Sequence, residues 1–456
     1  MASTSNPDLP RTTIRGAESA AGGQLLGRYR WAVCALIFAA TTINYVDRQI
    51  LALIKEYLDR ELGWSNEQYG LVNSAFQGAY ALGLFAFGWF IDRYGTKVGY
   101  TVATGLWSVA ALSHALVGSI TGFFGARIFL GASEGGNFPA AIKAVALWFP
   151  RRERALATAV FNSGANVGAI VAPALVPAIA HALGWRWAFV FAGLAGFGWI
   201  LLWLPFYDPP GRSRRVSTAE RAVIESDGDE AVSGVVPAGW RRALGHRQAW
   251  AFVAAKFMTD PVWWFFLTWL PDYFRVSRGL DIRHGWLHLS TIYAIVTVLS
   301  ISGGSLSGTL LSRGWTVTRA RKSCLVLFAL GVLPIWWVTR VGDWPAVLLI
   351  GLAGASHQAW SATLYTTSSD VFPRKDVGTI VGLGSMAGAI GGIMFPWFCG
   401  ALLDRWHAAG DVTGGYGILF GMCASAYLVA FAVHHVLSPT LDPLVREGRP
   451  DDRPGG

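Results

Sequence analysis

The sequence predicts an all-α membrane protein with twelve transmembrane helices, and two observations support that prediction. Of its 456 residues, 53% are hydrophobic and only 14% are charged, whereas about 25% of the residues of a typical soluble domain are charged. The apolar residues lie in twelve continuous stretches, and a helix of about 20 apolar residues suffices to cross a bilayer. This pattern excludes an ordinary soluble enzyme.

One polar segment divides the apolar stretches into two groups of six. The first group lies near 31–57, 66–90, 98–118, 121–147, 154–181 and 185–207. The second lies near 247–273, 286–311, 321–340, 343–370, 377–404 and 415–437. We therefore expect an N-terminal tail (1–30), a six-helix bundle (31–207), a linker (208–246), a second six-helix bundle (247–437) and a C-terminal tail (438–456).

The lysines and arginines are distributed unevenly between the loops. If the two termini share one side of the membrane, that side carries 25 Lys and Arg residues and the other side carries 8. Because basic residues concentrate on the cytoplasmic side, we expect both termini and the linker in the cytoplasm, as in a bacterial inner-membrane protein. The net charge of +9 then reflects topology and contact with the lipid bilayer, and we expect no nucleic-acid partner.

Short sequence runs recur between the two groups at a nearly constant offset. Phe149-Pro150-Arg151-Arg152 recurs 223 positions later as Phe372-Pro373-Arg374-Lys375. The run that starts at Gly88 has a partner that starts at Gly308, at an offset of 220. Two parallel six-helix repeats are typical of one transporter architecture, in which the substrate lies between the halves near the bilayer midplane.

Two stretches of the first group contain ionisable residues near their centres. Asp47 and Arg48 lie in the first stretch, and Arg127 and Glu134 lie seven residues apart in the fourth. One interpretation is a structural network of ion pairs between helices. The other, which we favour because desolvating four charges is costly, assigns the arginines to an anionic ligand and the carboxylates to proton uptake.

Further polar residues in the apolar stretches are secondary candidates. Gln77 and Tyr80 lie on one helical face, as do Asn162 and Asn166; amides and hydroxyls suit recognition of a hydroxylated ligand but also join membrane helices. In the seventh stretch Lys256 and Asp260 are spaced i, i+4 and can neutralise each other. Pro261 predicts a helix break there, and His357, near the middle of the tenth stretch, is either a packing residue or a proton relay.

The loop from Gly88 to Lys97 is a candidate for conformational gating. Asp92 can face a helix N-terminus, and Arg93 can face a carboxylate. The alternative is an ordinary basic turn.

Several short runs of the sequence resemble those of the major facilitator superfamily. Gly88-Trp-Phe-Ile-Asp-Arg-Tyr-Gly-Thr-Lys97 is similar to the signature of its loop between the second and third helices. Other runs resemble its anion:cation symporter branch, and within that branch the hexuronate transporters. These runs are Asn44-Tyr-Val-Asp-Arg48, Gly131-Ala-Ser-Glu-Gly-Gly-Asn-Phe-Pro139, Trp148-Phe-Pro-Arg-Arg-Glu-Arg154, Thr259-Asp-Pro-Val-Trp-Trp264 and His357-Gln-Ala-Trp-Ser361.

The resemblance implies roles for individual residues. It assigns the substrate carboxylate to Arg48 with Tyr45 and Tyr80 nearby, and proton handling to Asp47 and Glu134 with Arg127 as their partner. It also implies a substrate-facing role for His357, Gln358 and Ser361, with Trp264 as a further candidate. The sequence departs from the branch at Ala359 and Thr363, where glycine and asparagine are usual.

The resemblance implies proton-coupled uptake of a hexuronate such as galacturonate or glucuronate by alternating access. We expect a monomer that works without a metal or a cofactor. Import of an aldonate, an aldarate or an aromatic acid remains open, as does coupling to sodium. A membrane-embedded enzyme is disfavoured because the apolar stretches contain no catalytic motif of the common kinds. A sensor is disfavoured because the linker is too short for an output domain.

Overall fold

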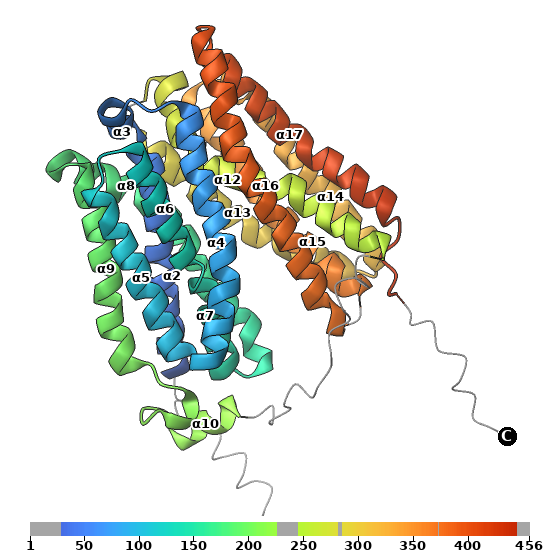
Figure 1. Cartoon of the computed structure of the whole chain (residues 1–456). Coiled ribbons are helices and arrows are strands. Elements are labelled where there is room, and N and C mark those ends of the chain that lie inside the picture. The colour runs from blue at the N-terminus through green and yellow to red at the C-terminus, as the bar shows by residue number, and fades with distance from the viewer. Residues whose placement is uncertain (1–28, 226–244, 281–284, 373, 445–456) are drawn as a thin grey trace, which may run out of the picture.

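The computed structural model describes residues 29–225, 245–280, 285–372 and 374–444, and within these ranges it contains helices and no β-strand (Figure 1). Residues 1–28, 226–244 and 445–456, which belong to the expected tails and linker, lie outside the described residues, as does Pro373 of the recurring run.

Each of the twelve apolar stretches is helical. The first group contains α2 (Tyr29–Leu53), α3 (Lys55–Leu62), α4 (Asn66–Tyr94), α5 (Thr96–Leu116), α6 (Ile120–Glu134), α7 (Asn137–Trp148), α8 (Arg151–Leu183) and α9 (Trp185–Phe206). The described part of the linker contains η1 (Pro210–Arg212) and α10 (Thr218–Ile224). The second group contains α12 (Arg247–Arg278), α13 (Trp286–Ser312), α14 (Val317–Val332), η2 (Leu333–Arg340), α15 (Asp343–Val371), α16 (Arg374–Ala408) and α17 (Val412–Leu437).

In the described part of the chain, six helical segments are long enough and apolar enough to cross a membrane. They are Asn66–Tyr94, Leu156–Leu183, Trp185–Phe206, Val317–Arg340, Ile380–Ala408 and Val412–Leu437. The other described helices fall short of the same limits on length, mean hydropathy or charge. The first apolar stretch, for example, continues beyond Leu53 into the short polar helix α3, and the fourth is divided between α6 and α7 at Gly135 and Gly136.

The expected helix break at Pro261 is wrong, because α12 continues through it without interruption. Membrane helices tolerate proline where a neighbouring helix packs against the weakened turn. Here α16 does so: a Cβ atom on Gly391 would lie 2.6 Å from the Pro261 ring. The seventh apolar stretch is therefore one helix whose side chains keep a single helical register.

The helices pack in two groups, which lie side by side in Figure 1. In the first group α2 packs against α8, α4 against α6, and α5 against α9. In the second, α12 packs against α16 and α17, and α13 against α15. The groups contact each other through α4 and α16, α8 and α13, and α2 and α12.

Several contacts between the groups lie at the end where α3 is found, which we call the α3 end; the opposite end, where α10 lies, is the linker end. The Asp404 carboxylate of α16 accepts hydrogen bonds from the backbone N–H groups of Asn66 (2.9 Å) and Glu67 (2.8 Å), at the start of α4. The Tyr69 hydroxyl of α4 donates to the backbone oxygen of Thr268 of α12 at 2.9 Å. These bonds hold the two groups together at the α3 end.

Candidate functional site

An ion pair joins the two stretches in which the sequence places buried charges. Arg48 Nε of α2 lies 2.7 Å from Glu134 Oε2 at the end of α6, and both side chains are buried. The position of α6 depends on Gly131, where any Cβ atom would overlap the backbone oxygen of Phe76 on α4. The close approach of α4 and α6 therefore helps to place Glu134 within reach of Arg48.

Aromatic rings surround the Arg48 guanidinium. Its carbon Cζ lies 4.3 Å from the ring centre of Tyr80, 5.0 Å from that of Tyr45 and 5.7 Å from that of Phe76. Cation–π attraction at these distances stabilises a desolvated guanidinium and fixes its plane. Arg48 is thus an oriented cation, the kind of group that binds a carboxylate through two parallel hydrogen bonds.

Asp47 and Arg127 are almost completely buried beside this ion pair. Among the described residues, neither carboxylate oxygen of Asp47 has a hydrogen-bond partner, and Nε and Nη2 of Arg127 also have none. No ion pair of 4 Å or less joins Arg127 to Asp47 or Glu134 in the described chain. Buried charged groups without partners are costly, and they are characteristic of functional sites in membranes.

A cavity of about 780 Å³ lies between the two groups of helices. Its lining includes nine candidate site residues from the sequence and others that were not predicted. The predicted ones are Tyr45, Asn162, Asn166, Lys256, Asp260, Trp264, His357, Gln358 and Ser361. Five polar or aromatic lining residues were not predicted: Ser163, Trp263, Thr297, Ser300 and Tyr365.

Two of the missed residues share helical faces with predicted ones. Tyr365 lies four residues after Ser361 on α15, and Trp263 lies three residues after Asp260 on α12. Side chains three or four residues apart are neighbours on a helix surface. Extending each predicted residue by one helical turn would therefore have found these two.

The Arg48 pocket is a second, smaller cavity of about 20 Å³, which Gln77 and Arg127 also line. Trp264 lines both this pocket and the large cavity. Tyr45 lines the large cavity while its ring lies against Arg48. Tyr45 and Trp264 therefore connect the oriented cation to the large cavity.

On the second group, the predicted residues of the cavity wall are held by specific contacts. Lys256 Nζ lies 2.8 Å from Asp260 Oδ2. The His357 ring is stacked on Trp263, with ring centres 5.5 Å apart, and its Nδ1 lies 2.6 Å from the hydroxyl of Tyr427. His357 is thus fixed by packing on one face and by a hydrogen bond at its edge.

The predicted gating residues lie at the linker end of α4. Asp92 pairs with Lys143 of α7 at 2.7 Å, and the same ammonium donates to the backbone oxygen of Ile91 at 2.9 Å. The Arg93 guanidinium lies 5.8 Å from the ring centre of Tyr94. These contacts stay within the first group of helices.

Four charged residues at the α3 end, Lys55, Asp59, Asp272 and Arg275, form what we call the α3-end cluster. Lys55 lies 3.0 Å from Asp59 and 3.2 Å from Asp272, and Arg275 lies 2.6 Å from each carboxylate. Lys55 and Asp59 belong to α3, whereas the other two belong to α12, so two of these four ion pairs join the two groups.

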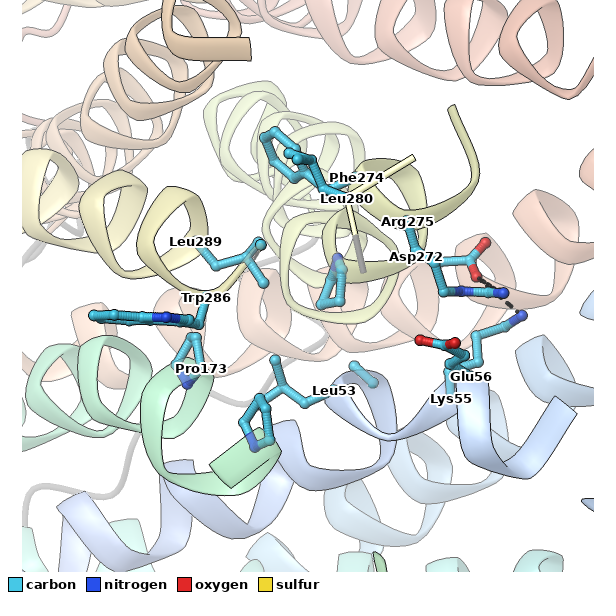
Figure 2. A pocket seen from close by; sticks show the side chains of 14 residues that line it. Leu53, Lys55, Glu56, Pro173, Asp272, Phe274, Arg275, Leu280, Trp286 and Leu289 are labelled. Carbon is cyan, nitrogen blue, oxygen red and sulfur yellow. Dashed lines mark hydrogen bonds and ion pairs between the residues drawn. The ribbon is translucent and has the colours of Figure 1, made fainter. Parts of the chain in front are cut away.

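Figure 2 shows Lys55 and Arg275 beside the Asp272 carboxylate, at the edge of a small cavity of about 30 Å³. Leu53, Pro173 and Leu289 line the same cavity. The Tyr416 hydroxyl of α17 also donates to Asp272 at 2.6 Å. None of the four residues of the α3-end cluster is a candidate from the sequence, because their partnership depends on the folded chain.

Comparison with known proteins agrees with this architecture. The family model of the Major Facilitator Superfamily matches residues 37–396, and the chain belongs to this superfamily. It is 31% identical to a protein named "Hexuronate transporter" from Escherichia coli (strain K12), over 87% of this chain and 90% of that one. It is 29% identical to a "D-galactonate transporter" from Escherichia coli O6:H1, over 84% and 91% of the two chains.

The fold also matches solved structures. The crystal structure of a bacterial homologue of the human lysosomal transporter Spinster superimposes with a TM-score of 0.72 at 17% identity, over 91% of this chain and 98% of that one. The relatives place the chain in the anion:cation branch of the superfamily, among transporters whose names include hexuronate and galactonate. It is a helical membrane protein of a transporter family.

Proposed function

We propose that the protein is a secondary active transporter that takes up a sugar-acid anion together with protons by alternating access. The observation that carries this proposal is the oriented Arg48 guanidinium, which is paired with Glu134 at 2.7 Å and connected to the large cavity through Tyr45 and Trp264. A hexuronate such as galacturonate or glucuronate is the substrate that we favour.

The cavity supports a small hydroxylated anion as the substrate. Its volume of about 780 Å³ falls within the range of about 300–1,000 Å³ that is typical of small-molecule sites. Asn162, Asn166, Gln358 and Ser361 line it and can exchange hydrogen bonds with sugar hydroxyls. The substrate carboxylate would bind Arg48, and the names of the relatives support a sugar acid.

The Arg48–Glu134 pair supports coupling to protons. A substrate carboxylate that binds Arg48 competes with Glu134 for the same guanidinium. A buried carboxylate that loses its cation is strongly destabilised unless it takes up a proton. Substrate binding and protonation of Glu134 would therefore favour each other, and Asp47 offers a second carboxyl group for a proton.

Proton coupling also meets an energetic requirement. An inside-negative membrane potential opposes entry of a monoanion by about 2.3 kcal/mol per 100 mV. One co-transported proton makes the step electroneutral, and a second lets the potential drive uptake.

The contacts between the helices support alternating access. The lining residues of the large cavity on α8, α12 and α15 lie mainly in the halves of those helices that are nearer the linker end. The α3-end cluster and the Asp404 hydrogen bonds hold the groups together at the opposite end. We propose that this arrangement is the conformation open to the cytoplasm and that breaking the α3-end contacts opens the other side.

The proposed topology follows the charge distribution. Twelve spans in bundles 31–207 and 247–437 would place both tails and the linker 208–246 in the cytoplasm of a bacterium, with 25 Lys and Arg residues on that side of the inner membrane against 8 on the other. We propose that the protein works as a monomer, because one chain supplies both walls of the cavity.

Reconstituted proteoliposomes test the proposed function. With an imposed inward proton gradient at fixed sodium, we expect accumulation of labelled galacturonate or glucuronate. Accumulation that depends on sodium at fixed pH would contradict proton coupling, and uptake of an unrelated acid instead would contradict the substrate.

Two variants test the proposed site. Arg48→Gln should abolish binding, because it removes the guanidinium to which the proposal assigns the substrate carboxylate. Glu134→Gln should retain exchange of substrate across the membrane but lose accumulation driven by the proton gradient. Normal accumulation in both variants would refute the assignment of the site.

A further inference from the structure

The large cavity contains an ion pair that the proposed binding step does not use. Among its described lining residues, Lys256 and Asp260 are the only lysine, arginine, aspartate or glutamate residues. Lys256 Nζ lies 2.8 Å from Asp260 Oδ2 and 4.5 Å from the ring centre of Tyr365. The pair occupies the wall formed by the second group, whereas Arg48 belongs to the first.

Helix α16 fixes this pair against the cavity. A Cβ atom on Gly388 would overlap Oδ2 of Asp260, so the backbone of α16 lies directly beside the carboxylate. The side chain of Asp260 is 19% exposed and that of Lys256 is 5% exposed. Asp260 is therefore the more accessible charge, and it cannot move toward α16.

The geometry of the pair would favour a ligand with one carboxylate over a ligand with two. When one carboxylate binds Arg48, the hydroxyls at the other end of a monoanion can donate to Asp260 and accept from Lys256. A second carboxylate at that end would meet the fixed negative charge of Asp260, and like charges that are close together in a site of low dielectric constant repel strongly.

We propose that Lys256 and Asp260 form a charge selector that admits sugar acids with one carboxylate and rejects dicarboxylates such as aldarates. This inference rests on the proposed function, because it takes Arg48 as the site of the first carboxylate. It adds a residue pair that defines the substrate class by exclusion, which is how many binding sites achieve specificity.

An i, i+4 pair on one helix can also serve only to neutralise two buried charges. In that case, replacing either residue would weaken transport of all substrates to a similar degree. The selector instead predicts that each replacement changes the preference for a monocarboxylate over a dicarboxylate. It also predicts that replacing Lys256 and replacing Asp260 shift this preference in opposite directions.

The experiment measures how unlabelled galacturonate and galactarate inhibit uptake of labelled galacturonate into proteoliposomes. Galactarate differs from the open-chain form of galacturonate by a second carboxylate in place of the aldehyde. In the wild type we expect galacturonate to inhibit at a concentration at least about tenfold lower than galactarate.

Asp260→Asn leaves the Lys256 cation uncompensated, so the preference should move toward galactarate by about tenfold or more. Lys256→Gln leaves the Asp260 anion uncompensated, so the preference should move the other way. Because the two variants give opposite shifts, either one tests the selector if the other fails to fold.

Asp370→Asn is the matched control. Asp370 pairs with Arg321 at 2.9 Å, and its side chain is 21% exposed, close to the value for Asp260, but it does not line the large cavity. Its removal should leave the ratio of the inhibitory concentrations of galactarate and galacturonate unchanged. If this ratio is unchanged in Asp260→Asn, or shifts equally in Asp370→Asn, the selector is wrong. Galacturonate uptake by the wild type would still uphold the proposed function in that case. Absence of galacturonate uptake by the wild type refutes both.

Discussion

Replacing Asp59 by asparagine should weaken the closure of the α3 end and favour the conformation in which that end is open. Asp59 accepts from Arg275 across the two groups at 2.6 Å, and from Lys55 and Trp64 within the first group. Of these three bonds, only the one from Arg275 joins the two groups, so it is the one that separation of the groups would break. The substitution therefore changes the closed state more than the open one, which is the condition for shifting a two-state equilibrium.

The size of the shift follows from the exposure of the pair. The side chains of Asp59 and Arg275 are 23% and 27% exposed, between the surface ion pairs that contribute about 0.2–1 kcal/mol and the buried pairs whose disruption costs about 3–5 kcal/mol. Lys55 keeps Asp272 as a partner at 3.2 Å. We therefore expect a loss of about 1–2 kcal/mol, which shifts the ratio of the two conformations about 5- to 30-fold.

Labelling of an introduced cysteine measures this shift. Ala52 is 6% exposed and lines the small cavity beside the α3-end cluster, so Ala52→Cys changes little and reports opening of that end. The four native cysteines are buried, so their background labelling should be low. In right-side-out membrane vesicles, a maleimide that cannot cross the membrane should label Ala52→Cys about 5- to 30-fold faster when Asp59→Asn is present.

Glu61→Gln on the same helix is the control. Glu61 accepts from Arg186 at 2.6 Å and from Trp185 at 2.7 Å, which mimics the contacts of Asp59 with an arginine and a tryptophan. Both of its partners belong to the first group, so its loss should not affect separation of the groups. Unchanged labelling in Asp59→Asn, or an equal increase in Glu61→Gln, would refute this account of closure.

Two further predictions concern stability. Gly131→Ala should lower the free energy of unfolding by about 1–3 kcal/mol through overpacking, because its Cβ atom would overlap the backbone of Phe76. The control, Gly125→Ala on the same helix, meets nothing within 4 Å and should be neutral or slightly stabilising. Equal melting temperatures of the two variants would contradict the close approach of α4 and α6. Burial raises the pKa of the Glu61 carboxyl, but the hydrogen bonds from Arg186 and Trp185 outweigh this and hold it below 4.5. Its stabilising contribution is therefore present near neutral pH and is lost as pH falls through the lowered pKa, so the difference in melting temperature between the wild type and Glu61→Gln should shrink below pH 4.5; a constant difference would argue against it.

The sequence predicts the helices well because their cause is local. A backbone in a bilayer must satisfy its own hydrogen bonds, so each long apolar stretch forms a helix, and all twelve stretches are helical. The same argument makes Asp47, Arg48, Arg127 and Glu134 noticeable, since a charge in an apolar stretch is costly wherever its helix lies. Sequence reasoning fails at Pro261, because a neighbouring helix supports α12 there.

Only the tertiary structure decides which of these charges are paired. The chain pairs Arg48 with Glu134, 86 positions away, and leaves the oxygens of Asp47 without partners among the described residues. It also brings Lys55 and Asp59 against Asp272 and Arg275, which lie more than 200 positions further along. Such pairings depend on how closely whole helices approach, and that distance is set by the side chains of two helices together. Local sequence thus determined that this is a helical membrane protein with buried charges, whereas helix packing decided where the large cavity lies and at which end these contacts join the two groups.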